Sequence, residues 1–393
     1  MVEMEKYKLG DICEIVSGST PKTNIDEYWE GTIKWITPAE LNDDTYIITD
    51  SVRKITELAV KKTGLKSFPE GTVILSSRAP IGKVAIAGCE MYCNQGFKNL
   101  ICSKKINNKY LYWFLKGNTV FLNSLGRGAT FKELSKSIVS NIEINLPDIV
   151  YQKKAVETLE KVSEIIALRK RELSSLDDLI KARFVEMFGD PANNEKGFIK
   201  APMGDYMTVL TDFSSNGSYK TLDSGVTMYD EPNYAWMVRT TDLESGDMTA
   251  IKYIDEEAYE LLAKSKIYGG EIIMNKIGSA GKIYLMPQID MPASLGRNAF
   301  MFRYDERINV KFLYHLLTSE YGQREIQQYV RGAVTKTITK NDVRAVLIIV
   351  PSIELQNEFE SFVEQVNKSK VKVQKALNET QKLFDSLMQQ YFG

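Results

Sequence analysis

Two short basic segments have residue types that can hold a phosphate group. Residues 127–132 have the sequence RGATFK, and residues 331–336 have the sequence RGAVTK. Glycine lets the backbone approach a ligand closely, a threonine hydroxyl and exposed N–H groups can bind a phosphate oxygen, and the flanking cations supply charge. The alternative is an ordinary exposed turn, but the recurrence of the segment favours phosphate contact. The candidate residues are Arg127, Thr130, Lys132, Arg331, Thr335 and Lys336.

Further polar side chains flank the turns between expected strands, or follow those turns closely. Arginine, lysine, glutamine and asparagine can form paired hydrogen bonds with the edges of guanine or adenine. When the two halves of the chain are aligned, Gln95 and Lys98 correspond to Arg297 and Asn298. The candidates in this group are Arg78, Lys83, Gln95, Lys98, Lys276, Lys282, Arg297 and Asn298.

The sequence lacks the motifs of common catalytic and cofactor sites. The segment GSAGK at residues 278–282 is not a Walker A phosphate loop, because its glycines are too close together and Ile283 replaces the required Ser or Thr. GxGxxG, HExxH and GxSxG motifs are missing, as is any segment resembling the Asn-Pro-Pro-Tyr of amino methylation. His315 lies in an apolar segment, where a packed side chain is favoured over a catalytic base. The sequence therefore indicates binding rather than catalysis.

The cysteines form no clear metal-binding or disulfide pattern. Cys13, Cys89, Cys93 and Cys102 all lie in the first half and have no counterparts in the second. Cys89 and Cys93 have the spacing of two metal ligands on one helix turn, but no second pair and no histidine accompanies them. Small buried thiols in a reducing compartment are the favoured interpretation, so we expect neither a metal site nor a disulfide.

Large apolar residues recur every seven positions between residues 151 and 187, and again between residues 355 and 391. Such narrow stripes predict two helices that pair with each other. At ~1.5 Å per residue each helix would be ~55 Å long, far longer than a core helix of a small domain. Lys370 interrupts one row of the second stripe. The expected contact residues are Leu159, Val162, Ile166, Leu173, Leu176, Ile180, Val363, Val366, Leu377 and Phe384.

The two halves of the chain are copies of one another. At a fixed offset of 204 residues, the sequence RGA at 127–129 recurs at 331–333, and Gln152 matches Gln356. Agreement at one offset over both a basic loop and a helix indicates an internal duplication. Other parts of the halves match only at offsets between 194 and 202, so the globular parts differ more than the helices do. This pattern predicts one scaffold that presents two different binding surfaces.

We therefore predict an α+β fold, with two pseudo-repeated mixed α/β domains separated by two long helices. A chain of 393 residues is long enough for two domains with a core each. In the first half, strands are expected at 72–75, 84–87 and 142–146, and a helix at 110–116. The predicted segments are a first domain at 1–148, a long helix at 149–189, a second domain at 190–350 that begins with a linker at 190–198, and a C-terminal helix at 351–393.

Charge and hydropathy exclude some classes of protein. A net charge of −1 and a pI near 6.2 exclude a polycation that coats nucleic acid, but they allow local basic patches. The sequence has no apolar run long enough to span a membrane, and its start lacks the basic and then apolar pattern of a signal peptide. We therefore expect a cytoplasmic protein without a membrane partner.

Several short motifs occur in an order that matches a known family. They are SGSTP at 17–21, YWEG at 28–31, IKWI at 33–36, the segment RGAT that begins at Arg127, Leu146-Pro147 with Gln152 opening the helix, and FGDP at 188–191. On these motifs the chain resembles, over its whole length, the specificity subunit of Type I restriction-modification enzymes. The second half departs from the pattern at 211–217, where TDFSSNG replaces the run that resembles SGSTP.

The resemblance implies two target-recognition domains, each of which binds one half of a split site in double-stranded DNA. It implies that the two long helices pair antiparallel as a coiled coil, which acts as a spacer and as a docking platform for two methyltransferase subunits. S-adenosylmethionine would then bind the methyltransferase subunits, with no cofactor on this chain. Endonuclease/translocase subunits would join through the complex. This chain would be the noncatalytic DNA-recognition subunit.

Two other interpretations remain. The first is a structural coiled-coil adaptor whose globular ends bind proteins rather than DNA; salt-sensitive, sequence-selective DNA retention would distinguish the two. The second is a single-chain restriction enzyme, which the missing catalytic motifs disfavour.

Overall fold

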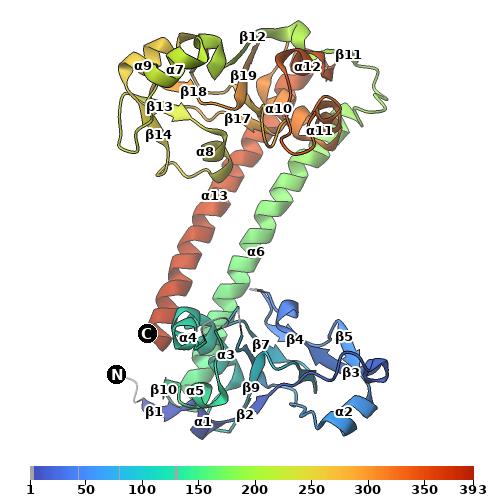
Figure 1. Cartoon of the computed structure of the whole chain (residues 1–393), viewed down its shortest axis with the longest axis vertical. Helices are drawn as coiled ribbons and strands as arrows, with labels where there is room; N and C mark the ends of the chain where they lie inside the picture. The colour runs from blue at the N-terminus through green and yellow to red at the C-terminus, as the bar shows by residue number, and fades with distance from the viewer. Residues whose placement is uncertain (1–3, 43, 79, 129–131) are drawn as a thin grey trace. The chain divides into compact units, whose positions relative to one another are not determined.

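A computed structural model describes residues 4–42, 44–78, 80–128 and 132–393 (Figure 1). The chain divides into two compact units: unit 1 is Met1–Arg171 with Gln374–Gly393, and unit 2 is Glu172–Val373. Each unit combines a globular domain with parts of both long helices, whereas the sequence prediction treated each helix as a separate segment. The predicted α+β fold, with two mixed domains and two long helices, is confirmed.

The globular domain of unit 1 contains small sheets and short helices. In its described residues, β2, β9, β6, β7 and β4 form one sheet, β5, β3 and β8 form a second, and β1 pairs with β10. Its strands and helices are β1 (Glu5–Lys8), α1 (Leu9–Ile12), β2 (Cys13–Ser17), β3 (Trp29–Ile36), β4 (Ile47–Ile48), β5 (Arg53–Ile55), α2 (Glu57–Thr63), β6 (Val73–Ser76), β7 (Val84–Ala87), β8 (Tyr92–Cys93), β9 (Phe97–Cys102), α3 (Asn108–Gly117), α4 (Thr119–Leu125), α5 (Lys136–Ser140) and β10 (Glu143–Leu146).

The globular domain of unit 2 repeats this order. The sheet β12-β19-β16-β17 corresponds to the core of the first sheet of unit 1, β14-β13-β18-β15 to the second, and β11-β20 to the two-stranded pair. Its elements are β11 (Ile199–Pro202), β12 (Met207–Asp212), α7 (Tyr219–Gly225), β13 (Ala235–Val238), α8 (Thr240–Ser245), β14 (Lys252–Ile254), α9 (Glu256–Leu261), β15 (Lys266–Ile267), β16 (Ile272–Asn275), β17 (Ile283–Leu285), β18 (Ala293–Leu295), β19 (Ala299–Tyr304), α10 (Val310–Thr318), α11 (Glu320–Gln327), α12 (Lys340–Ala345) and β20 (Leu347–Val350).

The strands and the helix predicted in the first half are present within a residue or two of the expected bounds. Cys89 and Cys93, however, are not on one helix turn, because Cys93 lies in β8 and Cys89 lies in the bend before it. All four cysteines are free; Cys13 and Cys93 are buried, as the thiol interpretation expected, whereas Cys89 and Cys102 are only half-buried. The part of the chain that the structure describes contains no cluster of three potential metal ligands.

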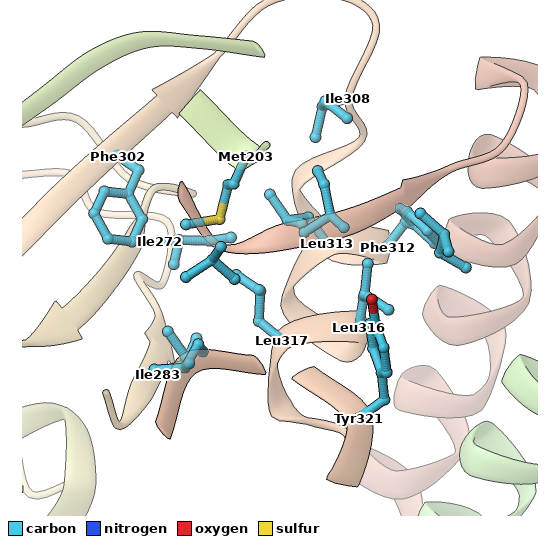
Figure 2. Close-up of a cluster of buried hydrophobic side chains, with 14 of the residues drawn as sticks. Met203, Ile272, Ile283, Phe302, Ile308, Phe312, Leu313, Leu316, Leu317 and Tyr321 are labelled. Carbon is cyan, nitrogen blue, oxygen red and sulfur yellow. The ribbon is translucent and has the colours of Figure 1, made fainter. Parts of the chain in front are cut away.

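Helix α10 supplies much of the core of unit 2. The side chains of Phe312, Leu313, Leu316 and Leu317 are spaced three and four residues apart, so they share one side of the helix. Leu313 and Leu317 lie toward the sheet, near Ile272 in Figure 2, whereas the ring of Phe312 packs against those of Phe184 and Phe188 on the first long helix. Burial of such side chains stabilises a fold by about 1.5–3 kcal/mol each. This core fixes the sheet whose edge carries the predicted contact residues.

The histidine on α10 is part of this packing. The ring of His315 lies 5.3 Å from that of Phe359, edge to face. Burial, assisted by the nearby charge of Lys370, lowers the pKa of His315 to about 4, so the imidazole is neutral at pH 7. The structure agrees with a packed histidine.

The two long helices, α6 (Ile149–Phe188) and α13 (Ile353–Phe392), run in opposite directions in both units. In unit 1 the ring of Tyr151 lies 6.1 Å from that of Tyr391, and Arg169 donates to the carbonyl of Ala376. In unit 2 the ion pair between Arg183 and Glu358 spans 2.9 Å. As residue numbers rise along α6, those of the contacting residues on α13 fall. The predicted antiparallel coiled coil is confirmed.

Burial along the predicted stripe is uneven. Leu159, Val162, Ile166, Ile180, Val363 and Val366 are buried, whereas Leu173, Leu176, Leu377 and Phe384 are only half-buried. Polar groups take part in the helix contact near the half-buried positions: Arg169 donates to Thr380 in unit 1, and Lys370 pairs with Asp177 in unit 2. Charged and hydroxyl side chains therefore share the helix contact with the apolar residues in this part of the two helices.

Candidate nucleic-acid interface

The basic segment of unit 2, residues 331–337, forms a closed loop. Arg331 and Thr337 exchange two backbone hydrogen bonds, of 2.9 and 2.8 Å. The loop is fixed to the strand turn at 276–282, because the N–H of Gly278 donates to the carbonyl of Lys336 over 2.9 Å. Gly332 has a φ of 107°, which favours glycine. The side chains of residues 331–337 are exposed on this fixed backbone.

The basic segment of unit 1, residues 127–133, is closed in the same way. Arg127 and Glu133 exchange backbone hydrogen bonds of 3.1 and 2.9 Å, and the N–H of Leu134 donates to the carbonyl of Ser77 over 2.8 Å. The corresponding bond in unit 2 joins Ile338 to Lys276. Three backbone hydrogen bonds of these loops therefore recur in both units, as the duplication in the sequence predicts.

Five of the six residues predicted for phosphate contact lie in the described part of these loops. The side chains of Arg127, Lys132, Arg331, Thr335 and Lys336 are exposed. Arg331 also pairs with Asp342 over 2.9 Å, so its guanidinium already has one anionic partner. Thr130 lies outside the described residues. The structure brings the shared cations to equivalent positions, and their contact with phosphate stays a prediction.

The lysines that follow the strand turns have protein partners. The ammonium of Lys83 donates to the carbonyls of Leu41 and Pro38, over 2.6 and 3.2 Å, and so holds residues 38–41 against the turn. Lys282, at the corresponding position of unit 2, pairs with Glu244. About half of the side chain of Lys282 is exposed, so its ammonium group can still bind an anion from solvent. The ammonium group of Lys83 instead donates to backbone carbonyls of the protein.

Two predicted cations of unit 1 pair with one carboxylate. Glu133 accepts a hydrogen bond of 3.0 Å from Arg78, and Lys98 lies 3.4 Å from the same carboxylate. Lys98 is only 6% exposed and also donates to Ser77 over 3.3 Å. Arg127 joins the group through its backbone bonds to Glu133. Arg78 therefore remains at the surface beside the loop, whereas Lys98 lies beneath it.

The equivalent place in unit 2 has a buried carboxylate instead. Asp212, at the end of β12, is 4% exposed and pairs with Lys276 over 2.6 Å and with Lys340 over 2.8 Å. Burial alone would raise the pKa of Asp212, but the hydrogen bonds from both lysines and from two serines keep that pKa well below its usual range. Asp212 was not among the residues predicted from the sequence. Its position after an apolar strand was too weak a signal.

Arg297 and Asn298 lie directly before β19. Arg297 pairs with Asp223 over 3.1 Å, and its guanidinium lies 5.1 Å from the ring centre of Phe213. The ion pair raises the pKa of Arg297, which stays charged. Asn298 has a φ of 69°, a conformation that asparagine tolerates better than most residues. Both side chains are exposed, as is that of Gln95 in unit 1.

One predicted correspondence between the halves is wrong. The N–H of Lys276 donates to the carbonyl of Asn298 over 2.8 Å, and the N–H of Ser77 donates to the carbonyl of Gly96 over 2.7 Å. Gly96, and not Lys98, is therefore the counterpart of Asn298. The predicted correspondence rested on matching polar side chains, and it misplaced the alignment of Lys98 by two positions. Gln95 remains the counterpart of Arg297.

Two buried glutamines, predicted only as marks of the repeat, fix each globular domain to a long helix. The amide of Gln152 accepts from the N–H of Asn107 over 2.8 Å and donates to the carbonyl of Pro147 over 2.9 Å. The amide of Gln356 makes the matching bonds to Asn309 and Pro351, both of 2.8 Å. Both glutamines are 0% exposed. Each one ties the start of α3 or α10 to the start of α6 or α13.

Comparison with known proteins identifies the family of the chain that carries these two loops. The model of the Type I restriction modification DNA specificity domain matches residues 1–177 and 207–381. The chain belongs to this family. A specificity subunit of the Type I restriction enzyme MjaIX from Methanocaldococcus jannaschii is 31% identical over 97% of this chain and 90% of its own length. The MjaVIII specificity subunit of the same organism is 23% identical over 95% of this chain and 90% of its own length.

Solved structures share the fold. The Type I restriction-modification S subunit from M. genitalium matches with a TM-score of 0.58 and 15% identity, over 100% of this chain and 96% of that one. A chain from a structure described as the basis of complex assembly and conformational transition of the Type I restriction-modification system matches with a TM-score of 0.63 and 17% identity, over 100% and 98%. The family resemblance noted in the sequence is confirmed. Within the described residues, no helix is long and apolar enough to cross a membrane.

Proposed function

We propose that this Type I specificity subunit recognises a bipartite site in double-stranded DNA, with one half-site bound by the globular domain of each unit. The observation that carries the proposal is the pair of closed basic loops. Three of their backbone hydrogen bonds recur in both units, and each loop exposes an arginine and a lysine at equivalent positions. Shared residues suit the DNA backbone, which is the same at every site, and divergent residues suit the bases.

The divergent residues lie next to the loops. In unit 1 they include Arg78 and Gln95, and in unit 2 Arg297 and Asn298. Gln95 and Arg297 are counterparts with different donors, and Arg78 and Asn298 correspond to residues without a side-chain donor, Ile277 and Gly96, so the two half-sites should be unlike. A rigid backbone beneath these side chains limits the conformational entropy that binding must overcome.

We further propose that the paired helices act as a scaffold for two methyltransferase subunits, through which endonuclease/translocase subunits join. Adenine methylation and S-adenosylmethionine would then belong to the methyltransferase subunits, and this chain would be noncatalytic and bind no cofactor. The complex would work in the cytoplasm. The near-neutral charge of the chain fits this division, since partner subunits can supply part of the phosphate contact.

Gel-shift assays and methylome sequencing test the proposal. The full chain, assembled with its methyltransferase subunits, should retain a subset of genomic fragments, and retention should fall steeply with salt. Methylome sequencing of cells that carry the system should show one split motif with unlike halves. Assembly without sequence-selective DNA retention would favour the protein-binding adaptor instead.

A further inference from the structure

Unit 2 contains a pocket of about 250 Å³ beside its basic loop. Phe213 and Met237, which are buried, are apolar parts of its lining. Thr240, Arg297 and Asn298 bring polar groups to it. The combination of an apolar interior with a few polar groups is typical of sites that bind a small planar ligand.

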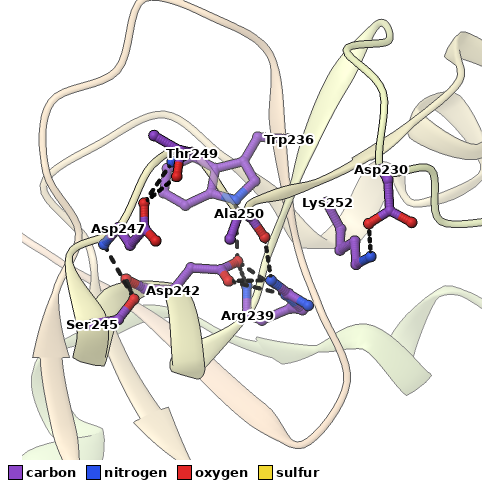
Figure 3. A network of polar contacts seen from close by, with 9 residues as sticks. All are labelled: Asp230, Trp236, Arg239, Asp242, Ser245, Asp247, Thr249, Ala250 and Lys252. Atoms are coloured by element: carbon purple, nitrogen blue, oxygen red, sulfur yellow. Dashed lines mark hydrogen bonds and ion pairs between the residues drawn. The ribbon is translucent and has the colours of Figure 1, made fainter. Parts of the chain in front are cut away.

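One wall of the pocket is held by a network of polar contacts (Figure 3). Arg239, which lines the pocket, donates to Asp242 over 3.0 Å and to the carbonyl of Ala250 over 2.8 Å. Asp242 is 4% exposed and also accepts a hydrogen bond from the indole of Trp236. Because Asp242 compensates the charge of Arg239, this guanidinium supplies a rigid wall rather than a strong anion site.

Arg297 forms another part of the lining. Its guanidinium lies 5.1 and 5.7 Å from the ring centres of Phe213 and Tyr219, and Asp223 holds it from one side. A guanidinium plane fixed beside aromatic rings can stack on a nucleobase and donate hydrogen bonds to its edge. The neighbouring amide of Asn298 can both donate and accept.

Two backbone hydrogen bonds connect the lining of the pocket to the basic loop. Asn298, at its edge, accepts a backbone hydrogen bond from Lys276 over 2.8 Å. Lys276 in turn accepts one of 3.1 Å from Ile338, directly after the loop. A DNA strand whose phosphates meet the loop would therefore pass the mouth of the pocket.

We propose that this pocket receives a single nucleobase of the DNA target, turned out of the duplex. The inference rests on the proposed function, since it needs DNA at the basic loop. The edge of a stacked base pair is flat and cannot fill a pocket. The volume of this pocket is also below the ~300–1,000 Å³ of sites for drug-sized ligands, so a smaller group such as one base is the better fit. Apolar and stacking contacts on the faces, with amide and guanidinium groups at the edge, are what an extruded base requires.

The proposal applies to unit 2 alone. The carbonyl of Val238 accepts from Gly296 over 2.8 Å, and that of Ile36 accepts from Asn94 over 3.1 Å, so Met237 and Trp35 are counterparts. In unit 1 the indole of Trp35 is 2% exposed and donates to the carbonyl of Ser19. A large ring therefore takes the place of the flexible Met237 side chain, and we expect no extruded base in that half-site.

The test uses the full chain with its methyltransferase subunits and duplexes that carry the methylated motif. An abasic site is placed opposite each base of the unit 2 half-site in turn. A base that faces an abasic site has no pairing to break when it leaves the duplex. If the complex turns that base out, it should therefore bind this duplex about tenfold more tightly than the fully paired one. The adenine that becomes methylated can show such an effect through the methyltransferase. The pocket predicts a second position.

A variant that fills the pocket distinguishes a base held in the pocket from the adenine held by the methyltransferase. Thr241→Trp places a large ring at an exposed residue of the lining, where the fold should tolerate it. In this variant an abasic site opposite the second position should no longer increase the affinity for DNA. The increase caused by an abasic site opposite the methylated adenine should remain. Ser224→Trp, on the exposed side of α7 and outside the pocket lining, is the matched control and should keep both effects.

The outcomes distinguish the two proposals. Sequence-selective binding without a second position, or a second position that persists in Thr241→Trp, would overturn the pocket proposal and leave DNA recognition intact. No sequence-selective binding by the unmodified chain would overturn the proposed function itself.

Discussion

The two basic loops have the same backbone hydrogen bonds but lie over opposite arrangements of charge. In unit 1 the buried charge is a cation, Lys98 on β9, and its acidic partner Glu133 is on the loop. In unit 2 the buried charge is an anion, Asp212 on β12, and its partners Lys276 and Lys340 lie beside the loop. The duplicated domains thus kept the backbone and exchanged the sign of the charge beneath it.

This difference shows which part of the structure is free to change. A buried charge is tolerated if a partner of opposite sign lies close by, whichever strand carries it. The backbone bonds that close each loop do not depend on that choice, because they join N–H and carbonyl groups. The side chains around the loop can therefore diverge, as two unlike half-sites require, while the loop keeps its geometry.

The largest expected effect comes from removing the buried anion. Asp212→Ala leaves two lysines without their partner, and we expect a loss of about 3–5 kcal/mol in the free energy of unfolding. The matched change in unit 1, Glu133→Ala, leaves one buried lysine that still donates to Ser77, so we expect about 1–3 kcal/mol. Denaturant unfolding monitored for each unit measures both. Equal losses would show that the two arrangements are energetically alike.

The next effect is a dependence on pH that only unit 2 should show. The pKa of His315 is lowered to about 4, so the unfolded chain binds a proton that the folded chain does not. This stability is complete above pH ~6.5 and is lost as the pH falls toward 4, by about 3 kcal/mol. In unit 1 the equivalent position is Trp113, because Asn107 and Asn309 make matching bonds at the starts of α3 and α10, and an indole does not titrate. Thermal melting of the wild type and of His315→Phe over this range measures the effect, and a variant that keeps the full slope would exclude His315 as its source.

A smaller effect distinguishes base contacts from backbone contacts. Arg297→Ala should weaken binding to the cognate site by about 1–3 kcal/mol, with little change on unrelated DNA. Gln95→Ala, at the equivalent position, should relax the other half-site only. Competition binding with DNA randomised in one half-site at a time gives the result. A loss of the same size on random DNA would assign Arg297 to the backbone.

The smallest effect belongs to the residues that the two loops share. Lys132→Ala and Lys336→Ala should each weaken binding to cognate and unrelated DNA alike, and should reduce the slope of log affinity against log salt by about one. Salt titrations of the complex measure this slope. A loss confined to cognate DNA, with the slope intact, would contradict the assignment of these lysines to phosphate.

The sequence alone determined the repeat, the long helices and the main strands, because these depend on periodic patterns of residue type. The stripe from Leu159 to Ile180 predicted a paired helix, and the recurring Gln152 and Gln356 marked where each long helix begins. Motifs in a fixed order also gave the family. Local patterns of this kind need no knowledge of distant contacts.

Only the tertiary structure decided how the candidate residues are used. Lys98 looked like a surface cation but is buried beside Glu133, and Lys83 donates to the carbonyls of residues 38–41. Asp212 was not predicted, because its partner Lys340 is 128 residues away along the chain. The pocket beside Arg297 likewise collects residues from separate strands and helices. Such contacts join residues that are far apart along the chain, so no local pattern of residue type shows them.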